Sequence, residues 1–212
     1  MSARRYNRLR TGNEGWLTSY ADLMTNLLIF FAVIVSASEI QTGRMERVLS
    51  RISGKPETGS LAEAKAVVEK AITQQNLQGQ VAAKMTDSGL EISYNSGVAF
   101  ASGRAEIKQE MLDPLLKTLA PLIPLAGKYR FAIEGHADAV PVADGSGFKS
   151  NWELSSARSM AVREQLDKLG VARDRIRVEA YADTKPLSEK ELAGLSEAER
   201  LARNRRVVVR LY

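Results

Sequence analysis

The sequence predicts an α+β fold: one N-terminal transmembrane helix, a linker, and a domain whose helices pack on a mixed β-sheet. Three observations predict it. The most apolar run of the chain lies near the N-terminus, and a stretch with several glycines and a proline follows it. From about residue 60, alternating apolar residues typical of strands are separated by apolar residues at helical spacing. The 212 residues suffice for one main domain and an appendage.

The apolar run can span a membrane only if the polar residues before it are counted. Leu27–Val35 would cover about 13 Å as a helix, against a hydrocarbon layer about 30 Å thick. A helix over 16–38 crosses that layer and places Trp16 and Tyr20 at headgroup level. Arginines precede it and predict a cytoplasmic N-terminus: Arg4, Arg5, Arg8 and Arg10. The same arginines, with the small residues after the run, also fit a signal peptide cleaved near Ala37.

Asp22 is a carboxylate inside this predicted helix. An ionised carboxylate exposed to lipid costs several kcal/mol, so Asp22 should face a partner helix or a water-filled path. Ser19, Thr25 and Asn26 share its stripe of the helix, and Tyr20 lies nearby as a supporting residue. We therefore predict an ion-translocating site, whose oxygens suit either Na⁺ or a proton path. The alternative is a shallow Asp22 that reaches the interface and caps the helix end.

The chain divides into four regions: a cytoplasmic tail at 1–15, the transmembrane helix at 16–38, a linker at 39–59 and a folded domain at 60–212. Alternation in the domain predicts strands at 90–94, 129–133, 176–180 and 207–211. Helical spacing predicts helices at 61–77, 107–122, 151–169 and 188–203.

Two of these helices carry further signals. Pro114 is tolerable in its helix only near the first turn. The helix at 151–169 ends before Gly170, with cap candidates in Ser150, Asn151 and Ser155. Its predicted buried face consists of Leu154, Ala157, Ala161, Leu166 and Leu169.

The long loop before that helix is the candidate binding site of the domain. Asp138 directly follows the second predicted strand, and Arg158 lies in the first part of the helix. The pair could hold a zwitterion, because a carboxylate binds an ammonium and a guanidinium fork binds a carboxylate. Taken alone, the two residues fit a simple mutual ion pair slightly better. His136 is predicted to be a hydrogen-bonded structural histidine, and Arg205 or Arg206 to face this loop.

The composition argues against several classes of function. A net charge of +5, dispersed along the chain, does not predict nucleic-acid binding. The chain has no cysteine and one histidine, which argues against a thiolate or histidine metal cluster and a Ser-His-Asp triad. We predict that the chain is not an enzyme and holds no metal or cofactor, with H⁺ or Na⁺ as a transported ion.

Two sets of motifs point to a family. Trp16-Leu-Thr-Ser-Tyr-Ala-Asp22-Leu-Met-Thr resembles the transmembrane signature of the MotB and PomB type of B subunit in ion-driven flagellar stators. The C-terminal part resembles the OmpA-like peptidoglycan-binding domain in these segments: Phe100-Ala-Ser-Gly-Arg-Ala-Glu-Ile, Gly135-His-Ala-Asp, Ser150-Asn-Trp-Glu-Leu-Ser-Ser-Ala-Arg, Gly170-Val and Asn204-Arg-Arg-Val. Their order in one chain is highly specific.

The resemblance implies a dimeric inner-membrane B subunit with a periplasmic domain, inside a ring of five polytopic MotA/PomA-like A subunits. It implies that Asp22 carries the translocated ion. It also implies that Asp138 and Arg158, with Asn151 close by, grip the diaminopimelate of the peptidoglycan stem peptide, so that the simple ion pair becomes the minority interpretation.

The sequence departs from the family pattern in two places. Ala137 stands where the family usually has threonine, and the segment 39–59 is short for a flagellar linker with its plug. Two alternatives therefore stay open. One is a B subunit of a related motor with five A and two B subunits, such as the Zorya anti-phage system. The other is a static, exported peptidoglycan-binding protein with a cleaved signal peptide.

Overall fold

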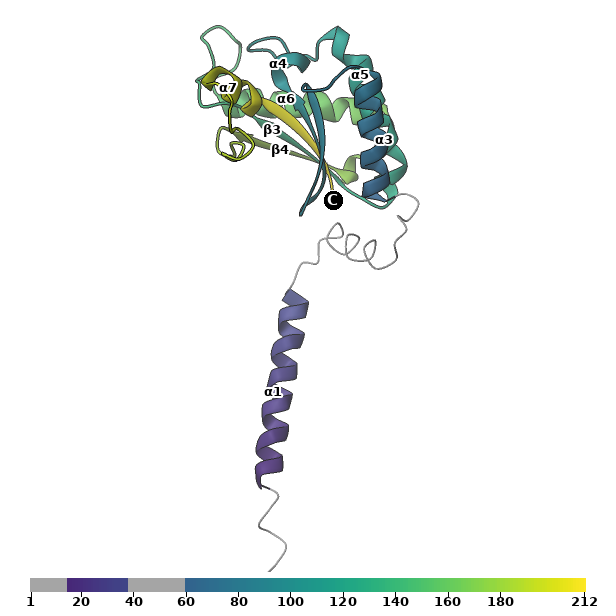
Figure 1. Cartoon of the computed structure of the whole chain (residues 1–212), viewed down its shortest axis with the longest axis vertical. Coiled ribbons are helices and arrows are strands. Elements are labelled where there is room, and N and C mark those ends of the chain that lie inside the picture. The colour runs from purple at the N-terminus through teal and green to yellow at the C-terminus, as the bar shows by residue number, and fades with distance from the viewer. Residues whose placement is uncertain (1–14, 38–59) are drawn as a thin grey trace, which may run out of the picture. The chain divides into compact units, whose positions relative to one another are not determined.

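The computed structural model describes residues 15–37 and 60–212 (Figure 1). Contacts between residues divide the chain into two compact units, Met1–Ile40 and Gln41–Tyr212. The predicted tail, apart from Gly15, lies outside the described residues, as do Ser38 and the predicted linker and plug region at 39–59. The four region boundaries therefore stay predictions.

Helix α1, Gly15–Ala37, is the described part of the first unit. Its segment Gly15–Ile34 has a mean hydropathy of 1.6 and belongs to the one helix, among the described residues, that is long and apolar enough to cross a membrane. Apolar side chains are exposed along this segment, including Leu23 at 65 % and Phe30 at 59 %. A helix that exposes so much apolar surface needs lipid or other helices around it. The predicted single transmembrane helix is confirmed, and the structure describes it from Gly15 to Ala37.

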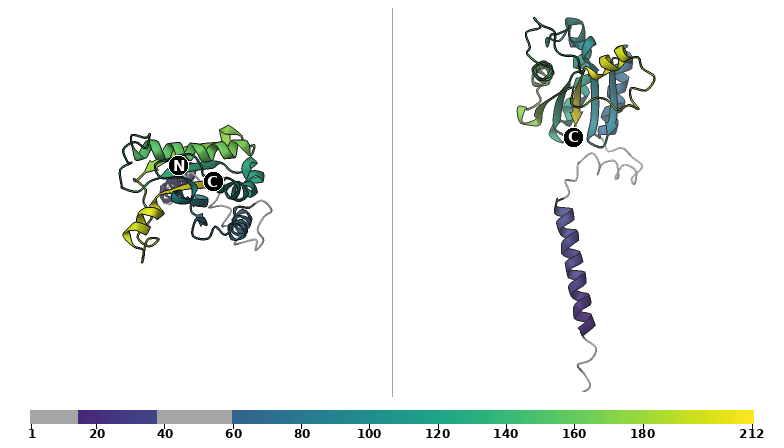
Figure 2. Two further views of the ribbon diagram at one scale, coloured as in Figure 1. Left: turned by 90° about the horizontal axis from the view of Figure 1, so that it is seen from above. Right: turned by 90° about the vertical axis from the view of Figure 1, so that its left-hand side faces the viewer.

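The second unit is built on a five-stranded sheet in the order β1-β2-β5-β3-β4 (Figures 1 and 2). The strands are β1 (Val81–Thr86), β2 (Gly89–Asn95), β3 (Phe131–His136), β4 (Ile176–Ala182) and β5 (Arg206–Leu211). β3 and β4 run parallel, whereas the other neighbouring pairs are antiparallel. The C-terminal strand β5 therefore lies in the centre, and its first residue, Arg206, pairs with His136 at the end of β3.

Three helices contribute to one core on one face of this sheet: α3 (Leu61–Gln74), α5 (Gln109–Leu119) and α6 (Asn151–Lys168). Alternate strand residues are fully buried in that core: Leu90, Ile92, Phe131, Ile133, Val207 and Val209. The helices add Val68, Leu119 and Leu166, which are equally buried. Shorter pieces connect these elements: α4 (Ser96–Ala99), η1 (Ala120–Gly127), η2 (Arg173–Arg175) and α7 (Glu197–Asn204). The predicted α+β fold is confirmed.

Two elements differ from the prediction. Strand β1 was not predicted because Val81-Ala-Ala-Lys-Met-Thr is rich in alanine and lysine, which are depleted in strands. It forms because it pairs with β2 in a hairpin, with Val81 opposite Tyr94. The predicted helix at 188–203 is wrong in its first part, since α7 begins only at Glu197. There the Ser196 side chain accepts a hydrogen bond from the Glu199 backbone N–H in a capping box.

Two details of the predicted helices are also wrong. Pro114 is the sixth residue of α5 rather than part of its first turn. The lost backbone hydrogen bond is outweighed by the buried face of α5. On α6, Ala157 is only half-buried and is not part of the core, whereas Leu154 and Leu166 are buried and the half-buried Ala161 and Leu169 pack against the core as predicted. Polar residues share the buried face instead: Ser155, Arg158, Ser159 and Gln165.

Candidate functional site

β3 and α6 approach so closely that only a glycine fits between them. A Cβ built on Gly135 would lie 2.2 Å from the backbone oxygen of Ser155 and 2.6 Å from Ser159 Oγ. Both serines are buried. A larger side chain at either position would push the helix away from the sheet. This contact explains the polar inner face of α6, and it fixes the N-terminal half of the helix beside the end of β3.

We expect Gly135→Ala to lower the free energy of unfolding by about 1 to 3 kcal/mol, because the added methyl group overlaps a backbone atom. Gly127→Ala is the matched control, since a Cβ at Gly127 would meet nothing within 4 Å. Urea unfolding followed by circular dichroism measures both variants. Equal midpoints for the two variants would show that α6 moves freely on β3.

Asp138 lies two residues beyond β3 and is 7 % exposed. Its Oδ2 is 2.5 Å from Arg205 Nη1, and its Oδ1 accepts a hydrogen bond of 3.1 Å from the backbone N–H of Val140. Asn151 Nδ2 donates to the backbone oxygens of Asp138, at 3.2 Å, and of Val140, at 2.9 Å. Asn151 therefore ties this loop to the first turn of α6, while Arg205 supplies the counter-charge to the carboxylate.

Arg158 is held by backbone oxygens rather than by a carboxylate. The side chain is 5 % exposed; its Nε donates to Arg104 O at 2.9 Å and its Nη2 to Ala101 O at 3.4 Å. The guanidinium lies over the ring of Phe100, 5.2 Å from its centroid. Burial lowers the pKa of Arg158 to about 10, so the group is charged at neutral pH. Within residues 60–212 no ion pair joins Arg158 to Asp138, so neither is neutralised by the other.

Asp138, Asn151 and Arg158 line one hollow of about 480 Å³. The structure thus brings together the three residues that the sequence predicted for binding. Arg158 has N–H groups beyond the two that the backbone oxygens occupy, and these can bind a carboxylate in a fork. Asp138 can attract an ammonium group on the other side of the hollow. The arrangement suits a ligand that carries both charges.

Three further residues of this hollow were predicted only in part or not at all. Either Arg205 or Arg206 was expected to face the loop, and it is Arg205 that does so, whereas Arg206 Nη2 donates to Lys185 O at 3.1 Å on the other side of the sheet. Phe100 and Lys108 also line the hollow. A single β-bridge between Phe100 and Ile107 brings them there, and no local pattern in the sequence signals such a bridge.

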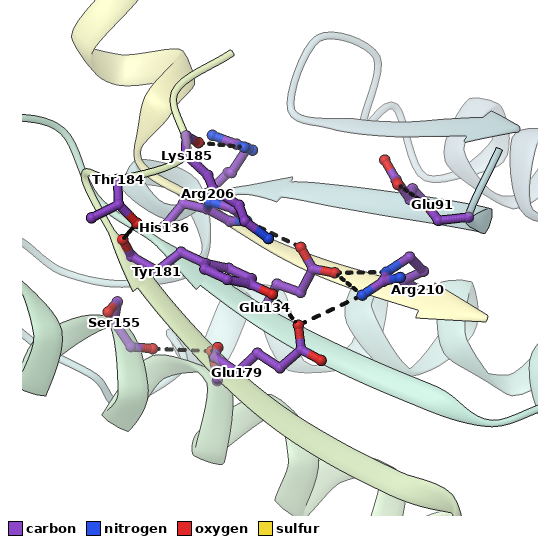
Figure 3. A network of polar contacts seen from close by, with 12 residues as sticks. Glu91, Glu134, His136, Ser155, Glu179, Tyr181, Thr184, Lys185, Arg206 and Arg210 are labelled. Atoms are coloured by element: carbon purple, nitrogen blue, oxygen red, sulfur yellow. Dashed lines mark hydrogen bonds and ion pairs between the residues drawn. The ribbon is translucent and has the colours of Figure 1, made fainter. Parts of the chain in front are cut away.

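The face of the sheet opposite the core carries a network of charged side chains (Figure 3). Arg210 Nε donates to Glu134 Oε1 at 2.6 Å, and the Tyr181 hydroxyl donates to Glu179 Oε2 at 2.5 Å. His136 is 3 % exposed and stacks on Tyr181, with its Nε2 3.4 Å from Glu134 Oε2. Burial lowers the pKa of His136 and so favours the neutral ring. The predicted hydrogen bond of His136 is not found, because neither ring nitrogen makes one within the described residues.

A larger hollow of about 810 Å³ lies over this charged face. Some of its charged groups form ion pairs: Lys84 Nζ is 2.7 Å from Glu191 Oε1, and Arg210 Nη2 is 2.6 Å from Glu134 Oε1. A charged ligand would have to break such pairs. The smaller hollow is the better candidate binding site, because it holds Asp138, Asn151 and Arg158 together.

In the predicted ion site on α1, two side-chain hydroxyl groups donate hydrogen bonds to backbone oxygens of the same helix. Ser19 Oγ donates to Gly15 O at 3.2 Å, and Thr25 Oγ1 donates to Ala21 O at 2.7 Å. A donating hydroxyl keeps its lone pairs, so both oxygens can still accept a hydrogen bond or coordinate a cation. The other predicted residues of this site, Tyr20, Asp22 and Asn26, are exposed in the first unit, as Ser19 and Thr25 are.

Comparison with known proteins agrees with both units. Residues 99–200 match the OmpA family, and residues 4–55 match the family described as the membrane MotB of the proton-channel complex MotA/MotB. The fold and the site therefore define an OmpA-like domain in a chain with one transmembrane helix. Motility protein B of Bacillus subtilis (strain 168) is 27 % identical, over 93 % of this chain and 90 % of that protein. This chain is therefore similar to MotB-type stator B subunits over nearly its whole length.

Solved structures agree with the fold of the second unit. A MotB-like protein from Desulfovibrio vulgaris superposes with a TM-score of 0.63 at 25 % identity, over 79 % of this chain and 95 % of that one. The cell wall anchor of the T6SS from Pseudomonas aeruginosa superposes with a TM-score of 0.58 at 26 % identity, over 68 % of this chain and 96 % of that one.

Proposed function

We propose that this chain is the B subunit of an ion-driven rotary motor of the inner membrane, of the flagellar stator type. Its α1 helix would carry the translocated H⁺ or Na⁺ on Asp22, and its OmpA-like domain would anchor the motor to peptidoglycan. One observation carries the proposal: a chain with a carboxylate in its transmembrane helix also has Asp138 and Arg158 in one hollow. The role is mechanical rather than enzymatic.

At the wall, the ligand is the diaminopimelate of the stem peptide. Its ammonium binds at Asp138 and its carboxylate in the fork of Arg158, while Asn151 keeps the loop against α6. Ala137 lines the hollow where the family usually has threonine. The hydroxyl is missing there, so binding depends more on these charged groups.

In the membrane, a proton or Na⁺ on Asp22 removes most of the cost of burying its charge. Five MotA/PomA-like A subunits would form a ring around two copies of this chain. Loading and release of the ion can then shift this ring between two arrangements. The wall-bound domains hold the dimer fixed while the ring turns.

Two other functions are compatible with the same N-terminal helix and the same OmpA-like domain. A related motor with five A and two B subunits, such as the Zorya anti-phage system, fits the short segment 39–59. An A-subunit gene beside defence genes rather than flagellar genes would identify such a motor. A static exported protein requires cleavage near Ala37. Mass spectrometry of the mature N-terminus separates this role from the motor, because a motor subunit keeps α1.

Peptidoglycan binding is tested by co-sedimentation of the full chain, in detergent, with purified peptidoglycan. We expect Asp138→Asn to weaken retention by about tenfold to a hundredfold, because one charge-assisted hydrogen bond contributes about 1.5 to 3 kcal/mol. Asp144→Asn is the matched control: it removes the same charge from an exposed position of the same loop. Equal retention of the two variants would contradict a role for Asp138 in wall binding.

A further inference from the structure

The hollow around Arg158 carries more positive than negative charge. Four titratable side chains line it: Lys108, Asp138, Arg158 and Arg205. Three are cations and one is a carboxylate. A ligand with one ammonium and one carboxylate adds no net charge, so it leaves two cations without a counter-charge. Electrostatic complementarity therefore favours a ligand with an additional negative group.

Asp138 is not free to receive an ammonium on its own. One of its oxygens contacts Arg205, and the other accepts the backbone N–H of Val140. A ligand ammonium must therefore share the carboxylate with Arg205 or displace it. The Arg205 side chain is 39 % exposed, so it can turn toward a ligand without unpacking the core. Once it turns, its guanidinium needs a new anionic partner.

Lys108 can act together with Arg205. Its Nζ donates one hydrogen bond, of 3.1 Å, to Gly97 O, and an ammonium group has three donors. Arg158, by contrast, is fixed by two backbone oxygens and the Phe100 ring, so it can bind one carboxylate in one place only. The hollow thus has one fixed and two adjustable positive groups.

We propose that Arg205 and Lys108 make this site selective for stem peptides whose diaminopimelate has both of its carboxylates free. This inference rests on the proposed wall-binding function. Arg158 binds one carboxylate, Asp138 binds the ammonium, and Arg205 with Lys108 binds the second carboxylate. Both carboxylates are free where the stem peptide ends at diaminopimelate. A following D-alanine or an amidation removes one, and a stem with lysine in this position has no side-chain carboxylate.

Isothermal titration of the full chain in detergent tests the selectivity with two synthetic peptides. One is L-Ala-γ-D-Glu-meso-diaminopimelate with both carboxylates free, and the other has the carboxyl group of the L-centre as an amide. We expect the wild-type chain to bind the first about tenfold more tightly, the effect of one charged contact. Arg205→Gln and Lys108→Gln should each reduce this ratio to about threefold or less. Arg173→Gln removes a charge from an 84 % exposed side chain outside the hollow and should leave the ratio unchanged.

The outcomes separate this inference from the proposed function. If the wild-type chain binds both peptides equally, or if both glutamine variants keep the full ratio, the inference is wrong although wall binding stands. If the wild-type chain binds neither peptide and is not retained by peptidoglycan, the proposed function itself is wrong. Arg205→Gln also removes the partner of a buried carboxylate and can lower stability, whereas Lys108→Gln tests the same selectivity without that change.

Discussion

Replacement of Asp22 with Asn is expected to abolish ion-driven work while leaving the assembly intact. Asparagine has nearly the same shape as aspartate but does not exchange a proton or offer a negative charge to Na⁺. In a strain that lacks the chromosomal copy, wild-type protein should restore the motor-dependent phenotype and Asp22→Asn should not. Both proteins should co-purify equally with the A-type partner, because the packing surface of α1 is unchanged.

Three control variants make the test specific. Asp22→Glu keeps the carboxylate and should retain part of the activity. Ser19→Ala and Thr25→Val remove oxygens that the structure leaves able to accept. A reduced dependence of activity on Na⁺ concentration in these variants would identify Na⁺ as the ion, whereas an unchanged dependence would favour H⁺. Near-normal activity of Asp22→Asn would reject ion transport on this residue.

The sequence predicted those helices and strands whose buried residues recur at a regular spacing. Leu90, Ile92 and Tyr94 alternate because every second residue of β2 faces the core, and the sequence shows this directly. β1 shows no such signal: it is an edge strand with small residues, and its partner rather than its composition determines its structure. The buried face of α6 was predicted only in part, because its serines face the sheet where Gly135 allows a close approach.

The candidate site was predictable for a different reason. Asp138 and Arg158 lie where a strand ends and a helix begins, and such junctions can be placed from the sequence, whereas the binding role of Asn151 was implied only by the resemblance to the OmpA-like domain. The partners of these residues could not be placed in the same way. Arg158 contacts a backbone oxygen 57 residues earlier in the chain, and Asp138 contacts an arginine 67 residues later. Contacts of this kind depend on the order of strands in the sheet, which periodicity does not determine.

Replacement of Arg158 is expected to have the largest effect on wall binding. Arg158→Ala removes the side-chain donors to the backbone oxygens of Arg104 and Ala101, of which Ala101 O keeps the Arg104 backbone N–H at 3.1 Å, and it removes the contact with the Phe100 ring. These losses should lower the free energy of unfolding by about 2 to 4 kcal/mol. Retention by peptidoglycan should fall below detection. The alanine variant alone cannot separate lost binding from lost stability, so a conservative variant is needed.

Arg158→Lys supplies that separation. Lysine keeps the positive charge and can still donate to a backbone oxygen, but it has no planar fork for a carboxylate. We expect this variant to unfold at nearly the wild-type urea concentration and yet to bind peptidoglycan at least tenfold more weakly. Arg163→Lys, on the same helix, is the matched control, because Arg163 pairs with Asp167 one turn away at 3.0 Å and lies outside the hollow. If Arg158→Lys binds peptidoglycan as tightly as Arg163→Lys, a point charge is sufficient, and the fork geometry of Arg158 has no part in recognition.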